Sequence, residues 1–121
     1  VMVILATDAP LSSRQLHRLC LRAAAGLVRT GSVHGHASGD FVVAFSTAQR
    51  LPHQPPALTG MQTVLLDEAR VMEGLFYAVV ESVEEAVLDS LFRAETMVGR
   101  DGHTCYALPV EEVVALIQKF R

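Results

Sequence analysis

Ser38 and Asp40 carry the most suggestive chemistry in the sequence, because a hydroxyl and a carboxylate two residues apart can orient or share a proton. If the backbone is extended there, both side chains point to one face, with Cα atoms roughly 6–7 Å apart. The pair closes the polar stretch HGHASGD, residues 34–40, which runs directly into the apolar segment FVVAFS. On spacing alone, a serine and an aspartate in a loop more often satisfy backbone amides than carry out catalysis.

The same stretch raises two other kinds of site. His34 and His36 could face one metal ion, but two ligands do not make a site and the spacing fixes no third. Gly31, Gly35 and Gly39 recur every four residues, but no helix follows them to offer its amino-terminal amides to a phosphate. The sequence therefore predicts neither a metal centre nor a phosphate site here.

The elements that must position Ser38 and Asp40 are two short strands joined by a helix. The runs at 1–6 and 40–48 are apolar without alternation, which predicts strands buried on both faces. Between them, Ser12 and Gln15 fit a capping box, and the helical pattern ends near Thr30.

Two strands joined by a helical crossover are expected to be parallel neighbours, with a right-handed connection. Their amino-terminal ends then lie side by side, so Val1 is expected close to Asp40. Two strands do not make a stable sheet by themselves, so further strands must come from elsewhere.

The rest of the chain is expected to be mostly helical. Residues 49–60 carry three prolines and a glycine and should be irregular. A helix should follow over about 67–96, then a loop over 98–104, and Pro109 suits the first turn of a last helix. We expect one α/β domain over residues 1–121.

Composition limits the classes of function. Hydrophobic residues make up 50% of the 121 residues and charged residues only 19%, so some apolar surface should be covered by a second polypeptide or by other copies of the chain. The formal net charge of −3 and the lack of a basic block exclude an evident nucleic-acid surface, and no apolar run approaches the ~18 residues of a membrane span. Cys20 and Cys105 are too few for a disulfide framework, which favours a cytoplasmic protein. Because the sequence opens inside a predicted strand, we expect that a longer chain was cut at this point, by a protease, by itself or at an artificially chosen boundary.

Four segments together resemble one known family. They are ATDAPL at 6–11, GLVRTGS at 26–32, SGDFVVAFSTA at 38–48 and AETMVGRDGH at 94–103. The ordered set is similar to the small (β) subunit of the L-aminopeptidase/D-esterase family, which includes the β-peptidyl aminopeptidases. The resemblance extends over nearly the whole chain.

This resemblance implies a precursor that cuts itself, so that a serine becomes the new amino terminus of the small subunit and the nucleophile. It implies an α-β-β-α sandwich completed by the large (α) subunit, assembled as a tetramer of αβ heterodimers. The implied activity removes amino-terminal residues from small peptides, amides or esters, including D-alanyl and β-amino-acid substrates, without metal or cofactor.

Carried over residue by residue, the family's pattern places the nucleophilic serine immediately before Val1, outside the sequence. Ser38 matches a serine that hydrogen-bonds near the nucleophile, and Asp40 matches the acidic residue that supports it. His36 and Gly39 of the same loop are expected to contact substrate. The family usually has Asn-Gly where this chain has His36-Ala37, and alanine would be disfavoured there if the position needs a positive φ.

Two other interpretations stay open. One is an acyltransferase of the ornithine acetyltransferase group, which uses a threonine nucleophile. The other is an inactive binding relative that keeps the fold. The identity of the residue before Val1 separates the aminopeptidase from both.

Overall fold

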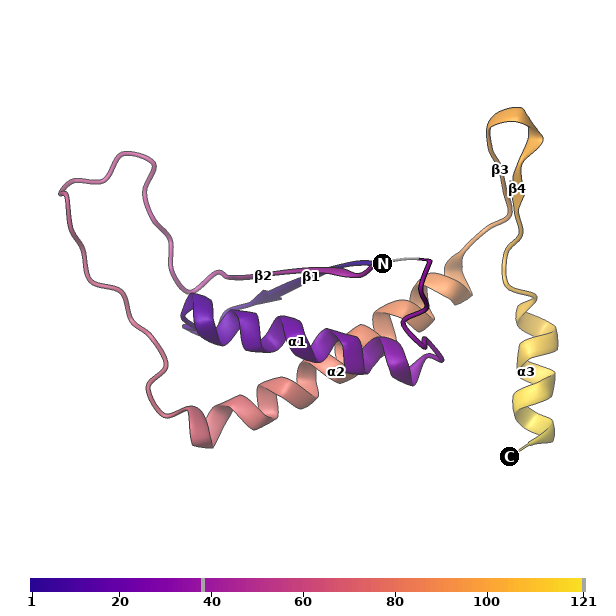
Figure 1. Ribbon diagram of the computed structural model, residues 1–121, viewed down its shortest axis with the longest axis horizontal. Coiled ribbons are helices and arrows are strands. Elements are labelled where there is room, and N and C mark those ends of the chain that lie inside the picture. The colour runs from indigo at the N-terminus through magenta and orange to yellow at the C-terminus, as the bar shows by residue number, and fades with distance from the viewer. Residues whose placement is uncertain (38, 121) are drawn as a thin grey trace. The chain divides into compact units, whose positions relative to one another are not determined.

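The computed structural model describes residues 1–37 and 39–120 and divides into two compact units, Val1–Glu84 and Glu85–Arg121 (Figure 1). The candidate site belongs to the first unit. Ser38 lies outside the described residues. That residues 1–121 form one domain stays a prediction.

The first unit is built on two parallel strands, β1 (Met2–Thr7) and β2 (Phe41–Ser46). Their register runs from Met2 opposite Phe41 to Thr7 opposite Ser46. The expectation that these strands are parallel neighbours is therefore confirmed. Because they are in register from their first residues, the start of the chain and the entry to β2 lie at the same end of the sheet (Figure 1).

The crossover between the strands is α1 (Ser13–Arg29), and its ends follow local chemistry. Ser12 and Gln15 form the predicted capping box, in which each side chain bonds the other residue's backbone amide. At the far end, Gly31 has a φ of 96°, a left-handed conformation that glycine adopts without steric cost. These two signals fix the length of the helix and the place where the site loop begins.

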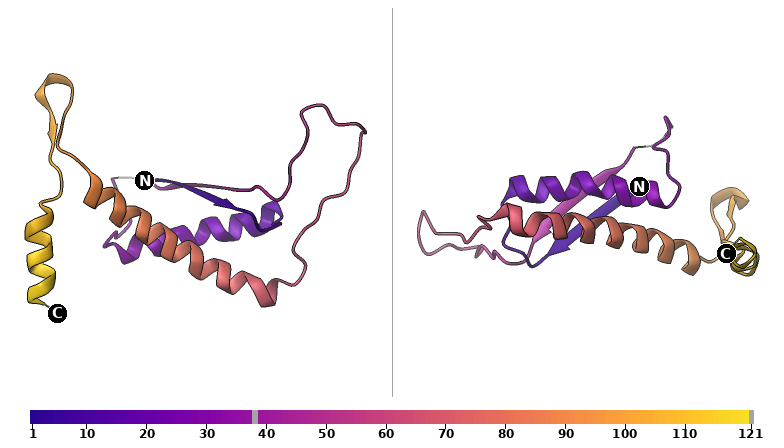
Figure 2. Two further views of the ribbon diagram at one scale, coloured as in Figure 1. Left: turned by 180° about the vertical axis from the view of Figure 1, so that it is seen from behind. Right: turned by 90° about the horizontal axis from the view of Figure 1, so that it is seen from below.

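The second helix, α2 (Glu68–Arg93), packs its first part against α1 on one side of the strands (Figures 1 and 2). The two helices come close together at Gly26. A Cβ built there would lie 2.7 Å from the carbonyl oxygen of Val80 and 2.7 Å from the Cβ of Val83, both on α2. The buried apolar side chains of this unit come from α1, α2 and the turn before α1: Leu11, Leu19, Ala23, Leu27, Met72, Val79 and Val83.

The prediction that both strands are buried on both faces is wrong for this chain by itself. Burial alternates strictly along each strand. The face turned away from the helices exposes Met2 (72%), Ile4 (66%), Phe41 (67%), Val43 (57%) and Phe45 (46%). In the described part of this unit, one helical layer covers one face of the strands, and the other face is left open to solvent.

The second unit contains structure where a plain loop was expected. β3 (Met97–Val98) and β4 (Thr104–Cys105) form a short antiparallel hairpin around a 3-10 turn (Arg100–Gly102). The turn closes because Asp101 and Gly102 have φ angles of 57° and 77°. The last helix, α3 (Val110–Lys119), begins directly after Pro109, close to its expected start.

Candidate active site

The site is centred on Asp40, at the entry to β2. Its Oδ1 lies 2.9 Å from the backbone nitrogen of Val1, which in this structure is an α-amino group. The same nitrogen donates to the carbonyl oxygen of Gly39 at 3.1 Å, and the Val1 carbonyl accepts from the Phe41 amide at 2.9 Å. The predicted proximity of Val1 and Asp40 is confirmed, and the parallel pairing of the strands produces it.

A third residue, His34, completes the cluster. Its Nδ1 lies 2.7 Å from Oδ2 of Asp40, so each carboxylate oxygen has its own partner. The sequence indicated a polar loop but did not join His34 to Asp40. A weak signal existed in the composition of the loop, where an imidazole and a carboxylate both precede the strand.

Both partners act on the ionisation of Asp40. The hydrogen bond from the Val1 α-amino group, and next the one from His34, lower the pKa of Asp40 below its ordinary value of 3.8. The side chain is only partly exposed, at 25%. Asp40 is therefore an anion at neutral pH and accepts hydrogen bonds at both oxygens.

The backbone of the loop shows whether alanine is tolerated at position 37. Among the described residues of this loop, the positive φ angles belong to Gly31 (96°) and His34 (47°). Ala37 therefore has a conformation that alanine tolerates. The two predicted substrate contacts, His36 and Gly39, are both exposed, and the carbonyl oxygen of Gly39 accepts from the nitrogen of Val1.

No group of three or more His, Cys, Asp or Glu side chains within residues 1–37 and 39–120 is arranged to hold a metal ion. In the same part of the chain, no helix combines the length and apolar character that crossing a membrane requires.

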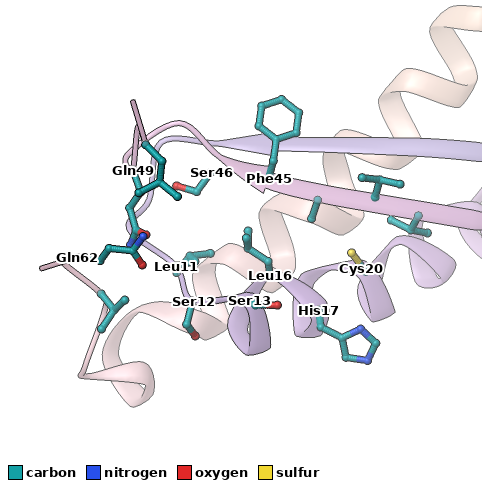
Figure 3. A pocket seen from close by; sticks show the side chains of 15 residues that line it. Leu11, Ser12, Ser13, Leu16, His17, Cys20, Phe45, Ser46, Gln49 and Gln62 are labelled. Carbon is teal, nitrogen blue, oxygen red and sulfur yellow. The ribbon is translucent and has the colours of Figure 1, made fainter. Parts of the chain in front are cut away.

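A cavity of about 660 Å³ lies elsewhere in this unit, between the start of α1, β2 and the irregular segment that follows β2 (Figure 3). Its lining includes His17, Cys20 and Ser46, and the described residues contribute no carboxylate to it. The Ser46 hydroxyl donates to the carbonyl of Ala9 at 2.6 Å and so links β2 to the turn before α1. This cavity therefore differs in chemistry from the cluster at Asp40, in which a carboxylate contacts the backbone nitrogen of Val1.

The chain belongs to peptidase family S58, whose sequence model matches residues 1–105. It is similar to the beta-peptidyl aminopeptidases BapA of Sphingosinicella xenopeptidilytica (35% identity) and Sphingosinicella microcystinivorans (37% identity). The matches cover 98% and 100% of this chain but only 29% and 30% of those proteins. The chain thus spans less than a third of the length of these relatives.

Solved structures give the same result at the level of the fold. The PH0078 protein from Pyrococcus horikoshii OT3 is 46% identical with a TM-score of 0.84, and the match covers 98% of this chain and 33% of that one. The L-aminopeptidase D-Ala-esterase/amidase from Ochrobactrum anthropi, described as a prototype of the serine aminopeptidases and a new variant of the Ntn hydrolase fold, is 36% identical. Its TM-score is also 0.84, with 98% and 33% of the two chains covered.

These comparisons confirm the resemblance to the L-aminopeptidase/D-esterase family and the α/β class of fold. The match in fold includes the parallel pair β1 and β2, on one face of which α1 and α2 lie.

Proposed function

We propose that this chain belongs to the carboxy-terminal subunit of an aminopeptidase, the subunit whose first residue, directly before Val1, is the nucleophile. The enzyme would remove amino-terminal residues from small peptides, amides or esters, including D-alanyl and β-amino-acid substrates. One observation carries the proposal: in a member of family S58, the backbone nitrogen of Val1, directly before β1, lies 2.9 Å from Oδ1 of Asp40. A serine immediately before Val1 would stand beside that carboxylate, because adjacent Cα atoms are about 3.8 Å apart.

The proposed reaction is acyl transfer through this serine. Its hydroxyl oxygen forms a bond to the scissile carbonyl carbon, and the bond to the leaving amine or alcohol breaks. The hydroxyl proton passes to the serine's own α-amino group, or into the pair Ser38 and Asp40, and then to the leaving group. Water cleaves the resulting ester and restores the hydroxyl. An α-amino group titrates near pH 8 and so can accept a proton under ordinary conditions.

The proposed partner is a large subunit from the same precursor. The exposed apolar face of the strands, with Ile4 and Phe41 near two-thirds exposed, is the surface that such a subunit would cover. The share of the relatives' length that this chain spans supports the same proposal. The proposal also includes an α-β-β-α sandwich formed by the two subunits and a tetramer of αβ heterodimers. The enzyme is proposed to be cytoplasmic and to need no metal or cofactor.

The test begins with the gene and the segment that precedes Val1. We expect expression of the whole reading frame to give two co-purifying chains, the smaller starting with serine, by intact mass and amino-terminal sequencing. The preparation should hydrolyse β-alanyl or D-alanyl p-nitroanilide. A continuous single chain without activity contradicts the proposal, and a threonine before Val1 favours the acyltransferase.

The role of Ser38 is tested in the same preparation. Replacing Ser38→Ala should slow both precursor cleavage and turnover, because the hydroxyl is expected to hold or pass the proton of the nucleophile. Unchanged rates for both steps would remove Ser38 from the site.

A further inference from the structure

His34 has a backbone conformation that the loop must hold against a steric preference. Its φ of 47° is left-handed, which is uncommon for residues other than glycine although less so for histidine. The amide of His34 donates to Oγ of Ser32 at 3.3 Å, which supports the turn locally. This turn directs the imidazole back toward the entry of β2, where Nδ1 meets Asp40 at 2.7 Å.

The hydrogen-bond roles at this contact follow from the chemistry of the partners. An ionised carboxylate has no hydrogen to donate, so Nδ1 of His34 must carry the proton in the contact with Asp40. Oδ1 of Asp40 accepts from Val1, and Oδ2 accepts from His34. The two donors hold the carboxylate from opposite oxygens and fix its rotation about the side-chain bond.

We propose that His34 is a positioning residue, whose Nδ1–H holds Asp40 so that the other carboxylate oxygen faces the start of β1. The proposal rests on the proposed function, because it takes the start of β1 as the place of the nucleophile. His34 acts through Asp40 and does not itself touch the reacting atoms.

The charge of the imidazole should matter as well as its hydrogen bond. A neutral imidazole can take up a second proton and with it a positive charge. The charged group that the described residues place against His34 is the Asp40 carboxylate, whose other oxygen meets the nitrogen of Val1, and His36 lies two positions along the same loop. Protonation of His34 adds a positive charge next to Asp40, and the site then loses some of the proton affinity on which acyl transfer depends.

The experiment uses the full precursor and two variants of His34. H34N keeps an amide N–H near the position of Nδ1 and tolerates the left-handed backbone, but cannot change its charge. H34G tolerates the backbone and removes the donor. We expect H34G to lower kcat/KM for β-alanyl p-nitroanilide by about 10–100-fold, the range expected for loss of a hydrogen bond to a charged group. H34N should stay closer to the wild type than to H34G.

The pH profile separates positioning from a merely structural role. The profiles of kcat/KM against pH for wild type and H34N should differ in shape, because an imidazole can gain a charge at position 34 and an amide cannot. H53N, at an exposed histidine in the irregular segment after β2, is the matched control and should follow the wild type throughout.

Each result for the His34 variants decides the proposal. Rates of H34G equal to the wild type at every pH overturn it, and so does an H34N as impaired as H34G. If H34G does not fold, as judged by thermal unfolding, the comparison of H34N with wild type across pH still decides. A wild-type precursor that is neither cut before Val1 nor active overturns the proposed function, and the role of His34 with it, and this result is seen without any variant.

Discussion

At the residue scale, the central feature is that Asp40 is held at both oxygens by groups from different parts of the chain. Val1 lies directly before β1, while His34 belongs to the loop that follows α1. Charge-assisted hydrogen bonds of this kind are about twice as strong as neutral ones and fix orientation as well as charge. A carboxylate supported in this way can bind or hold a proton donor at the chain start without reorganising during the reaction.

Replacing Asp40→Asn should therefore slow precursor cleavage and turnover by roughly 100-fold each, a typical loss for a proton-handling group. Asparagine keeps one acceptor oxygen but turns an N–H toward either Val1 or His34, so that a donor faces a donor. The measurement is the decay of the precursor band together with kcat/KM. Asp89→Asn, at an exposed aspartate that pairs with Arg93 on α2, should leave both rates as they are.

The contact between Val1 and Asp40 was predictable from the sequence, because the topology of the two strands determines it. A helical crossover between two apolar strands makes them parallel neighbours, and this alone places Val1 beside Asp40. The contact with His34 depends on a single left-handed residue inside a loop, and no periodicity in the sequence encodes that conformation. Ser38 lies outside the described residues, so its place beside Asp40 stays a prediction.

At the scale of elements, α1 and α2 are joined by a polar network as well as by the core. Glu68, at the start of α2, accepts from Arg14, Arg18 and Gln15 of α1. Gln15 is almost fully buried and also donates to the carbonyl of Leu65 at 2.9 Å. Arg14, Arg18 and Arg22 are spaced four apart along α1, and the face that they form meets α2.

The Glu68 contacts make the stability of this helix pair depend on pH. The hydrogen bonds from Gln15 and then Arg14, together with the nearby arginine charges, lower the pKa of Glu68 below its ordinary value of 4.5. The carboxylate thus stabilises the fold above about pH 4.5, and this stabilisation is lost as the pH falls through the lowered pKa. Urea unfolding of the processed protein should show that E68Q has a lower free energy of unfolding than wild type at neutral pH. The difference between the two should become smaller at acid pH.

Glu81→Gln, at an exposed glutamate of the same helix, should show little change at any pH. If the free energies of unfolding of wild type and E68Q differ by the same amount at neutral and at acid pH, the charge of Glu68 contributes nothing to the stability.

The close crossing of the helices at Gly26 gives a second prediction at this scale. G26A should destabilise the processed protein by roughly 1–3 kcal/mol, because the added methyl meets backbone and a β-branched side chain of α2. The matched control is G74A in the middle of α2, where a Cβ meets nothing within 4 Å. Alanine there should stabilise by about 0.5–1 kcal/mol through helix propensity. Thermal or urea unfolding that moves both variants in the same direction would contradict this account of Gly26.

At the scale of the whole molecule, the apolar composition of the chain corresponds to the apolar side chains left exposed on one face of the strands. Half of the residues are hydrophobic, yet few side chains in the described residues are buried, and those lie between α1, α2 and the inner face of the strands. The runs without alternation predicted strands covered on both faces, whereas burial in the described residues alternates along each strand. The sequence could predict that the second face needs a cover but not the shape of that cover, because the composition of a strand does not specify the surface that packs against it.

The need for a cover predicts the effect of a charge at Ile4, which is 66% exposed on the uncovered face of β1. In the chain alone, I4D replaces a side chain that is already two-thirds exposed, so it removes little burial. In the proposed precursor the same carboxylate would be enclosed between layers, and a buried, unpaired charge costs on the order of 3–5 kcal/mol. We expect I4D to reduce precursor cleavage and the recovery of co-eluting subunits by size-exclusion chromatography. L58D, at a fully exposed leucine of the irregular segment, should assemble normally. Normal assembly of I4D would mean that the large subunit does not cover this face, and the apolar surface of the strands would then need a different partner.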